Sequence, residues 1–203
     1  MNLLVSTVVA LAADAGATNA AMEDYFAGEK RGGYVLVGMG VGGLLAGGLL
    51  RRSSSPTARG ASYPLLGLGV VHAAAGIFIH VASDRRIDQF HGQIAKDPAA
   101  FIDAEQQRMQ GVSTQFTALK IAEVVLIVGG LGMAAAGRRT DRPRLAGAGL
   151  ALALEAGATL GFDVFAAGRA HDYRDRLAAL DVTAAIDPDT GAATALVVTS
   201  GRF

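Results

Sequence analysis

Four apolar segments, each about 20 residues long, alternate with polar segments along the chain. They cover approximately residues 33–50, 61–83, 117–137 and 145–168. An α-helix of about 20 residues crosses a hydrocarbon core of roughly 30 Å, and a backbone in lipid must satisfy its hydrogen bonds internally. A soluble helix would carry a polar stripe, which residues 34–50 lack. The pattern predicts an all-α integral membrane protein, a bundle of four transmembrane helices.

The polar segments predict helices that continue beyond these spans. Residues 1–31 are expected to form a helical arm outside the membrane, and residues 32–180 to form the bundle with its helical extensions. Asp97 and Pro98 are typical of a helix start, with an N-cap followed by proline at the first helical position. We therefore expect one helix to run from Pro98 directly into the third span.

The two ends of the chain differ in pattern. Residues 181–203 predict a small β-hairpin, because Pro188-Asp189-Thr190-Gly191 has turn chemistry between two segments with strand-like patterns. The apolar start of the chain resembles the core of a signal peptide but lacks a basic residue before it. Whether residues 1–17 are a signal sequence stays open.

Basic residues predict the orientation in the membrane. Seven of the 18 Lys and Arg residues lie in two short loops, residues 51–59 and 138–144. Under the positive-inside rule both loops are cytoplasmic, and both termini then lie outside. We expect the chain in a plasma membrane, the inner membrane of a bacterium.

Composition and motifs exclude several classes of function. The chain has no cysteine, so disulfides and cysteine-ligated metals are excluded, and its zero net charge argues against a nucleic-acid partner. The segment Gly38-Met39-Gly40-Val41-Gly42-Gly43 matches a dinucleotide fingerprint, but the acidic residue required about 20 positions later is missing. No other catalytic motif is present. We expect a protein that is not an enzyme and has no cofactor or metal.

Glycines spaced by four predict close helix packing, because small residues let two helix backbones approach in lipid. These glycines are Gly38, Gly42, Gly43, Gly47, Gly157 and Gly161.

The chain also resembles itself when it is shifted. At an offset of 83 residues, His72 falls on Glu155 and His80 falls on Asp163. Two spans per unit would make this a tandem repeat with both units in the same orientation. Gly-rich apolar segments also resemble one another by chance, so the duplication stays one of two interpretations.

Ionisable residues inside the spans are the main candidate site. They are His72, His80, Lys120, Glu123, Glu155 and Asp163. Charge in lipid is costly, so these side chains should face the bundle interior and one another. They predict either a proton or cation site or polar contacts that only hold the helices together.

Three functions are consistent with these features. The first is a small, non-catalytic integral subunit or scaffold of a larger membrane assembly, with the lipid bilayer and other membrane subunits or a second copy as partners. The second is a proton- or ion-coupled transporter or channel component that uses the polar residues. The third is a redox protein, with haem or a metal held by His91 and His171 from the extensions.

Overall fold

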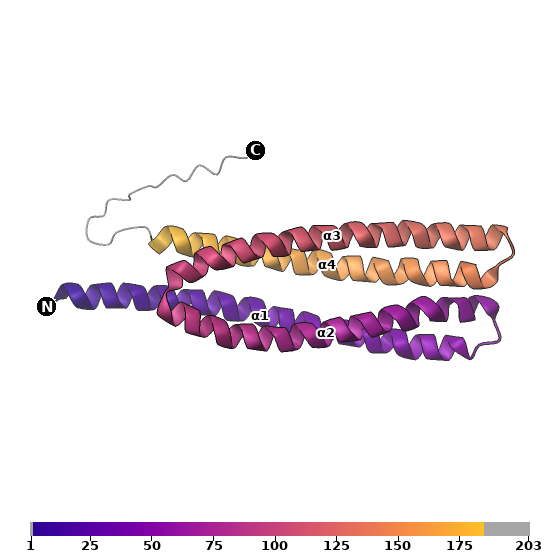
Figure 1. Ribbon diagram of the computed structural model, residues 1–203, viewed down its shortest axis with the longest axis horizontal. Helices are drawn as coiled ribbons and strands as arrows, with labels where there is room; N and C mark the ends of the chain where they lie inside the picture. The colour runs from indigo at the N-terminus through magenta and orange to yellow at the C-terminus, as the bar shows by residue number, and fades with distance from the viewer. Residues whose placement is uncertain (1, 185–203) are drawn as a thin grey trace, which may run out of the picture.

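The described part of the chain forms a long helical bundle. The computed structural model describes residues 2–184, with side chains described for residues 15–180. The helices are α1 (Asn2–Arg51), α2 (Pro56–Lys96), α3 (Pro98–Arg139) and α4 (Pro143–Ala184). Both loops lie at one end, here called the loop end (Figure 1). The start of α1, the junction between α2 and α3 and the end of α4 lie toward the other, distal end (Figure 1).

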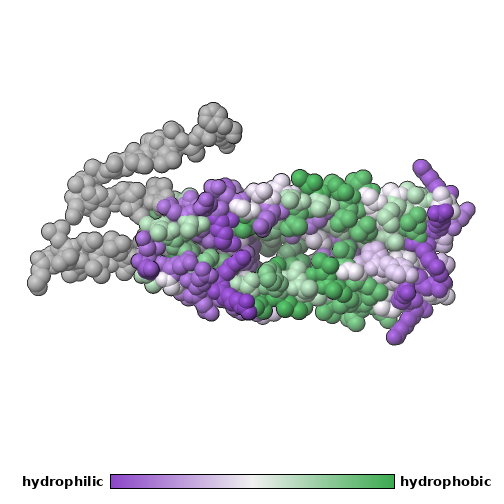
Figure 2. Space-filling view, in the orientation of Figure 1, coloured by the Kyte–Doolittle hydropathy of each residue, from purple (hydrophilic) through white to green (hydrophobic). Residues whose placement is uncertain are grey.

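An apolar belt surrounds the middle of the bundle. Figure 2 shows hydrophobic side chains gathered there, with hydrophilic side chains at the loop end and over the distal part. Each of the four helices contains a window long and apolar enough to cross a membrane. The prediction of an integral membrane protein is supported at this level. The part beyond the belt, residues 15–30, 84–115 and 169–180, is called the distal region below.

Local sequence explains where the helices begin. The Ser55 hydroxyl caps α2 by accepting a hydrogen bond from the Ala58 amide, and Pro56 follows. Asp97 caps α3 by accepting a hydrogen bond from the Ala100 amide, with Pro98 at the first helical position. The predicted helix start at Asp97 is therefore confirmed. Because Asp97 alone separates α2 from α3, the chain reverses direction within one residue.

Buried positions recur every seven residues in each helix. On α2 they are Ser62, Gly69, Gly76, Ser83 and Phe90. On α3 they include Ile102, Met109, Glu123, Gly130 and Gly137. A strict seven-residue repeat keeps one face of each helix toward its neighbours with a left-handed supercoil. Small residues occupy most of these buried positions inside the belt, and large residues occupy most of them in the distal region.

Small residues let the helices approach closely inside the belt. A Cβ atom added to Gly40 on α1 would lie 2.6 Å from the Gly69 carbonyl oxygen on α2, and one added to Gly130 on α3 would lie 2.7 Å from the Gly149 carbonyl oxygen on α4. The helices pair as two hairpins, α1 with α2 and α3 with α4, which meet mainly between α2 and α4. Whether the hairpins arose by duplication stays a prediction.

One sequence prediction needs correction, and another is refined. Residues 2–31 are helical, as predicted for the arm, and they continue without a break into the first span as α1. Met22 and Phe26 of this segment are fully buried. The β-hairpin predicted at residues 181–203 is not supported, since residues 181–184 form the last turn of α4 and the remainder lies outside the described residues. Helical hydrogen bonding continues through residues 181–184, for which the sequence pattern predicts a strand.

Candidate functional site

Five polar side chains from three helices meet in the interior of the apolar belt. We call them the membrane cluster: His72, Glu123, Glu155, Thr159 and Asp163. His72, Glu123 and Asp163 are at most 7% exposed, and the Glu155 side chain is 15% exposed. At 1.5 Å per residue, these positions lie about 18–30 Å from the loop ends of their helices. The cluster therefore extends from just beyond the middle of the belt, at Glu155, to its distal edge, at Asp163.

His72 is held between two groups of α4. Its Nε2 lies 3.0 Å from Thr159 Oγ1, and its Nδ1 lies 3.8 Å from Glu155 Oε2. The Thr159 hydroxyl donates its proton to the Glu155 carbonyl oxygen at 2.9 Å. When the Thr159 hydroxyl donates to that carbonyl oxygen, it accepts from Nε2–H of His72. In either tautomer, Nδ1 faces the Glu155 carboxyl group.

A pair of carboxyl groups forms the second half of the cluster. Glu123 on α3 and Asp163 on α4 lie close enough for their side chains to interact. Two ionised carboxylates would repel each other and have only acceptor atoms, so a hydrogen bond between them would need a shared proton. Glu123 Oε2 and His72 Nδ1 are buried without a hydrogen-bond partner among the described residues. The cluster thus holds two buried polar atoms that can each make a further hydrogen bond.

Two of the six predicted residues lie outside the membrane cluster. The His80 ring packs against Tyr34 at 4.8 Å between centroids, and its Nε2 is 3.9 Å from Asp84 Oδ2. Asp84 also accepts a hydrogen bond of 2.6 Å from Lys30, which holds the pKa of Asp84 below its ordinary value. Lys120 is close enough to Asp163 to interact with its charge, but it lines a separate cavity.

The predicted glycine contacts divide into two groups. A Cβ atom on Gly43 would lie 3.0 Å from the Leu65 carbonyl oxygen, and one on Gly47 would meet Leu66, so both glycines lie at the contact between α1 and α2. The other four have no atom of the described chain within 4 Å of an added Cβ: Gly38, Gly42, Gly157 and Gly161. These four glycines do not pack helices of the same chain together.

The structure gives His91 and His171 separate partners. His91 Nε2 lies 2.8 Å from Glu23 Oε1 on α1, and His171 Nε2 lies 3.5 Å from Asp175 on its own helix. Within residues 15–180, no three His, Asp or Glu side chains converge in a way that could hold a metal ion.

Sequence reasoning missed a second buried polar group, in the distal region. Glu105 is 2% exposed, and Arg108 donates to both of its oxygens at 2.6 Å. Phe26 and Phe90 pack against each other at 5.6 Å between centroids, and both lie toward one side of the guanidinium, at 5.8 and 5.9 Å from its carbon to the ring centroids. Burial lowers the pKa of Arg108, but the hydrogen bonds and charge of Glu105 outweigh that effect and hold it above its ordinary value.

Two tyrosines complete this distal core. The rings of Tyr25 and Tyr173 stack at 4.4 Å between centroids, and the Tyr25 hydroxyl donates to Glu29 at 2.8 Å. Burial raises the pKa of both phenols, with added contributions from Glu29 at Tyr25 and from Glu105 at Tyr173. Glu29 accepts hydrogen bonds from both Tyr25 and Ser83.

The seven-residue spacing was the signal that could have found both polar groups. Glu123 lies seven residues from Gly130 and fourteen from Gly137, and Asp163 lies seven from Ala156 and from Ala170, all of them buried. Glu105 lies three residues after Ile102 and four before Met109, on the same face of the helix.

No protein-family model, curated protein or solved structure matches this chain.

Proposed function

We propose that this integral membrane protein binds protons in its membrane cluster and acts as a proton-coupled component of membrane transport. The buried, neighbouring carboxyl groups of Glu123 and Asp163 carry the proposal, because two acids that interact away from water favour a state in which they share a proton. A buried ionisable group in a membrane is expensive and is by default functional. Here three carboxyl groups and one imidazole lie in the interior of the bundle as two neighbouring pairs.

The donor arrangement suits a proton better than a metal ion. The groups meet in pairs, Glu123 with Asp163 and His72 with Glu155, and no set of three converges among the described side chains. A proton on His72 Nδ1 or on Glu155 would close the gap of 3.8 Å between them into a hydrogen bond. His72 also lies near enough to Asp163 to interact with its charge, so the two proton sites are coupled.

Infrared difference spectroscopy of the protein in lipid nanodiscs tests proton binding directly. We expect the carbonyl stretching band of a protonated carboxyl group at neutral pH. Combining Glu123→Gln with Asp163→Asn should abolish it, because neither acid of the pair remains, and each single variant should reduce it, because one buried acid is left. Asp172→Asn, an exposed site on α4, is the matched control and should keep the band. A band of equal size in all variants would refute the proton-binding site.

Transport itself needs a second measurement. In vesicles with an imposed potential and a trapped pH-sensitive dye, we expect the protein to speed proton uptake and Asp163→Asn to return it to the rate of protein-free vesicles. Circular dichroism of the reconstituted variant checks that the helices remain. If proton uptake never exceeds the rate of protein-free vesicles, the proposal of transport is wrong and only proton binding is left.

A second candidate, a subunit or scaffold of a membrane assembly, is favoured by the four open glycines. Gly38 and Gly42 leave an uncovered small-residue face on α1, and Gly157 and Gly161 leave one on α4. Such faces suit close contact with another transmembrane helix. Mild-detergent purification followed by mass measurement would show a complex, and Gly42→Leu combined with Gly161→Leu should dissociate it. A monomer in the wild type would refute this candidate.

A further inference from the structure

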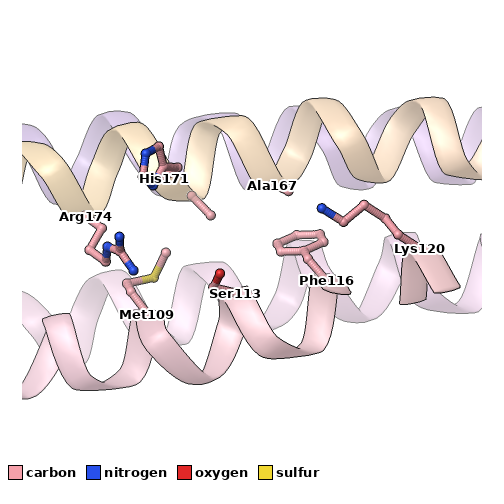
Figure 3. A pocket seen from close by; sticks show the side chains of 8 residues that line it. Met109, Ser113, Phe116, Lys120, Ala167, His171 and Arg174 are labelled. Atoms are coloured by element: carbon pink, nitrogen blue, oxygen red, sulfur yellow. The ribbon is translucent and has the colours of Figure 1, made fainter. Parts of the chain in front are cut away.

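A small cavity with a basic lining lies between α3 and α4, where the apolar belt meets the distal region. Its volume is about 40 Å³. Lys120, His171 and Arg174 line it together with Ser113, Phe116 and Met109, and it has no acidic lining residue. Figure 3 shows Lys120 and Arg174 at opposite ends of the cavity, with Phe116 and Ser113 between them.

The two permanent cations have capacity left for a ligand. Within the described residues, neither the Lys120 amino group nor the Arg174 guanidinium takes part in a hydrogen bond or a salt bridge. Other distal arginines do: Arg108 binds Glu105, and Arg176 binds Asp24 at 2.8 Å. The positive charges of Lys120 and Arg174 line the same cavity and repel each other, so an anion bound between them would be stabilising.

The end of the cavity nearest the belt lies at the depth of a lipid headgroup. At 1.5 Å per residue, Lys120 lies about 29 Å and Arg174 about 46 Å from the loop ends of their helices. A hydrocarbon core of roughly 30 Å that begins at the loop-end arginines ends near Lys120, and the headgroup layer follows. Lysine can extend its amino group from the belt toward that layer while its stem stays in apolar surroundings.

Apolar surface next to the cavity favours a lipid over a free ion. Phe116 and Met109 belong to its lining. Toward the middle of the belt, Ile121 on α3 and Phe165 on α4 are 62% and 67% exposed. An acyl chain could lie along this surface while its headgroup occupied the cavity.

From the charge, depth and apolar surroundings we infer that this cavity binds the phosphate group of an anionic phospholipid. Arg174 and Lys120 supply the charge, and Ser113 supplies a hydroxyl donor. Basic sites of this kind between transmembrane helices recognise phosphate headgroups by charge-assisted hydrogen bonds. This inference stands apart from the proposed proton site, because lipid binding requires no proton movement.

Native mass spectrometry of the full chain in detergent, with added phosphatidylglycerol, tests the inference. We expect bound lipid, and binding about tenfold weaker in Arg174→Gln and in Lys120→Gln, because each loses a charged hydrogen bond. Arg174→Lys should recover part of the affinity. Arg85→Gln, at an exposed site on α2, is the matched control and should bind as the wild type does. Wild-type affinity in both cavity variants would overturn the inference.

Two further ligands identify the source of the phosphate. Phosphatidylcholine carries a compensating positive charge and should bind more weakly than phosphatidylglycerol, so equal binding would overturn the anionic specificity. Inorganic phosphate lacks acyl chains and should not displace phosphatidylglycerol at comparable concentration. If it displaced the lipid fully, a free anion would be the ligand and the lipid inference would be wrong.

Discussion

The buried ion pair of the distal core allows a quantitative test of how this region is stabilised. Arg108→Met removes two hydrogen bonds of 2.6 Å and leaves the Glu105 carboxylate, 2% exposed, without its cation. Breaking a buried pair on one side costs about 3–5 kcal/mol, because the remaining charge stays desolvated. For a chain of this size, that loss corresponds to a decrease in melting temperature of roughly 10 °C.

The double variant separates the pair from its surroundings. Glu105→Leu combined with Arg108→Met replaces both charges by apolar groups of similar volume, which is often neutral or stabilising. We therefore expect the double variant to regain most of the stability that Arg108→Met loses. Since the pKa of Arg108 is raised and already lies above the accessible range, the pair should stay ionised at high pH.

The assay is thermal unfolding in detergent followed by circular dichroism. Helical signal reports the whole bundle, and the near-ultraviolet signal reports the stacked Tyr25 and Tyr173 of the distal core. The chain has no tryptophan to obscure the tyrosine signal. A loss below about 1 kcal/mol in Arg108→Met, or a double variant as unstable as the single one, would refute the reasoning.

Three more predictions follow from other parts of the bundle. Gly40→Leu should prevent the close approach of α1 and α2, because even its Cβ atom would lie 2.6 Å from the Gly69 carbonyl oxygen. The unfolding temperature should therefore fall. Gly42→Leu is the control and should leave the unfolding temperature unchanged, because an added Cβ atom there meets open space. In alkaline solution the raised pKa of Tyr25 and Tyr173 should keep both phenols protonated above pH 10 while unfolded chains ionise, so stability should fall as pH rises beyond about 10. Ultraviolet titration of Tyr25→Phe and Tyr173→Phe checks this, and normal ionisation of all tyrosines in the folded protein would contradict it. The Arg169 guanidinium crosses the Gly28 backbone and donates a hydrogen bond of 2.8 Å to the Tyr25 carbonyl oxygen. Gly28→Leu should displace this guanidinium and weaken the contact between α1 and α4. Unchanged protease resistance of the distal region would argue against that contact.

Part of the candidate site was predictable, because the cost of charge in lipid forces ionisable residues of a span toward the interior. His72 and Glu155 do face each other, and Glu123 meets Asp163. Sequence spacing did not separate His80 from this set, although His80 lies only two turns from His72. The packing of α1 against α2 places Tyr34 beside His80, whereas Asp84 lies one turn further along α2 itself.

The sequence by itself determined the four helices, their alternation and the start of α3, because hydropathy and caps act over a few residues. It did not determine which small residues lie between helices: Gly43 packs against α2, whereas its neighbour Gly42 stays open, and both have the same local chemistry. The buried pair of Glu105 and Arg108 was equally hidden, since two charges in a polar segment look solvated until aromatic rings from other helices cover them. Interactions within a few residues are enough to form each helix. Which side chains become buried depends on which helix surfaces meet, and only the assembled bundle decides that.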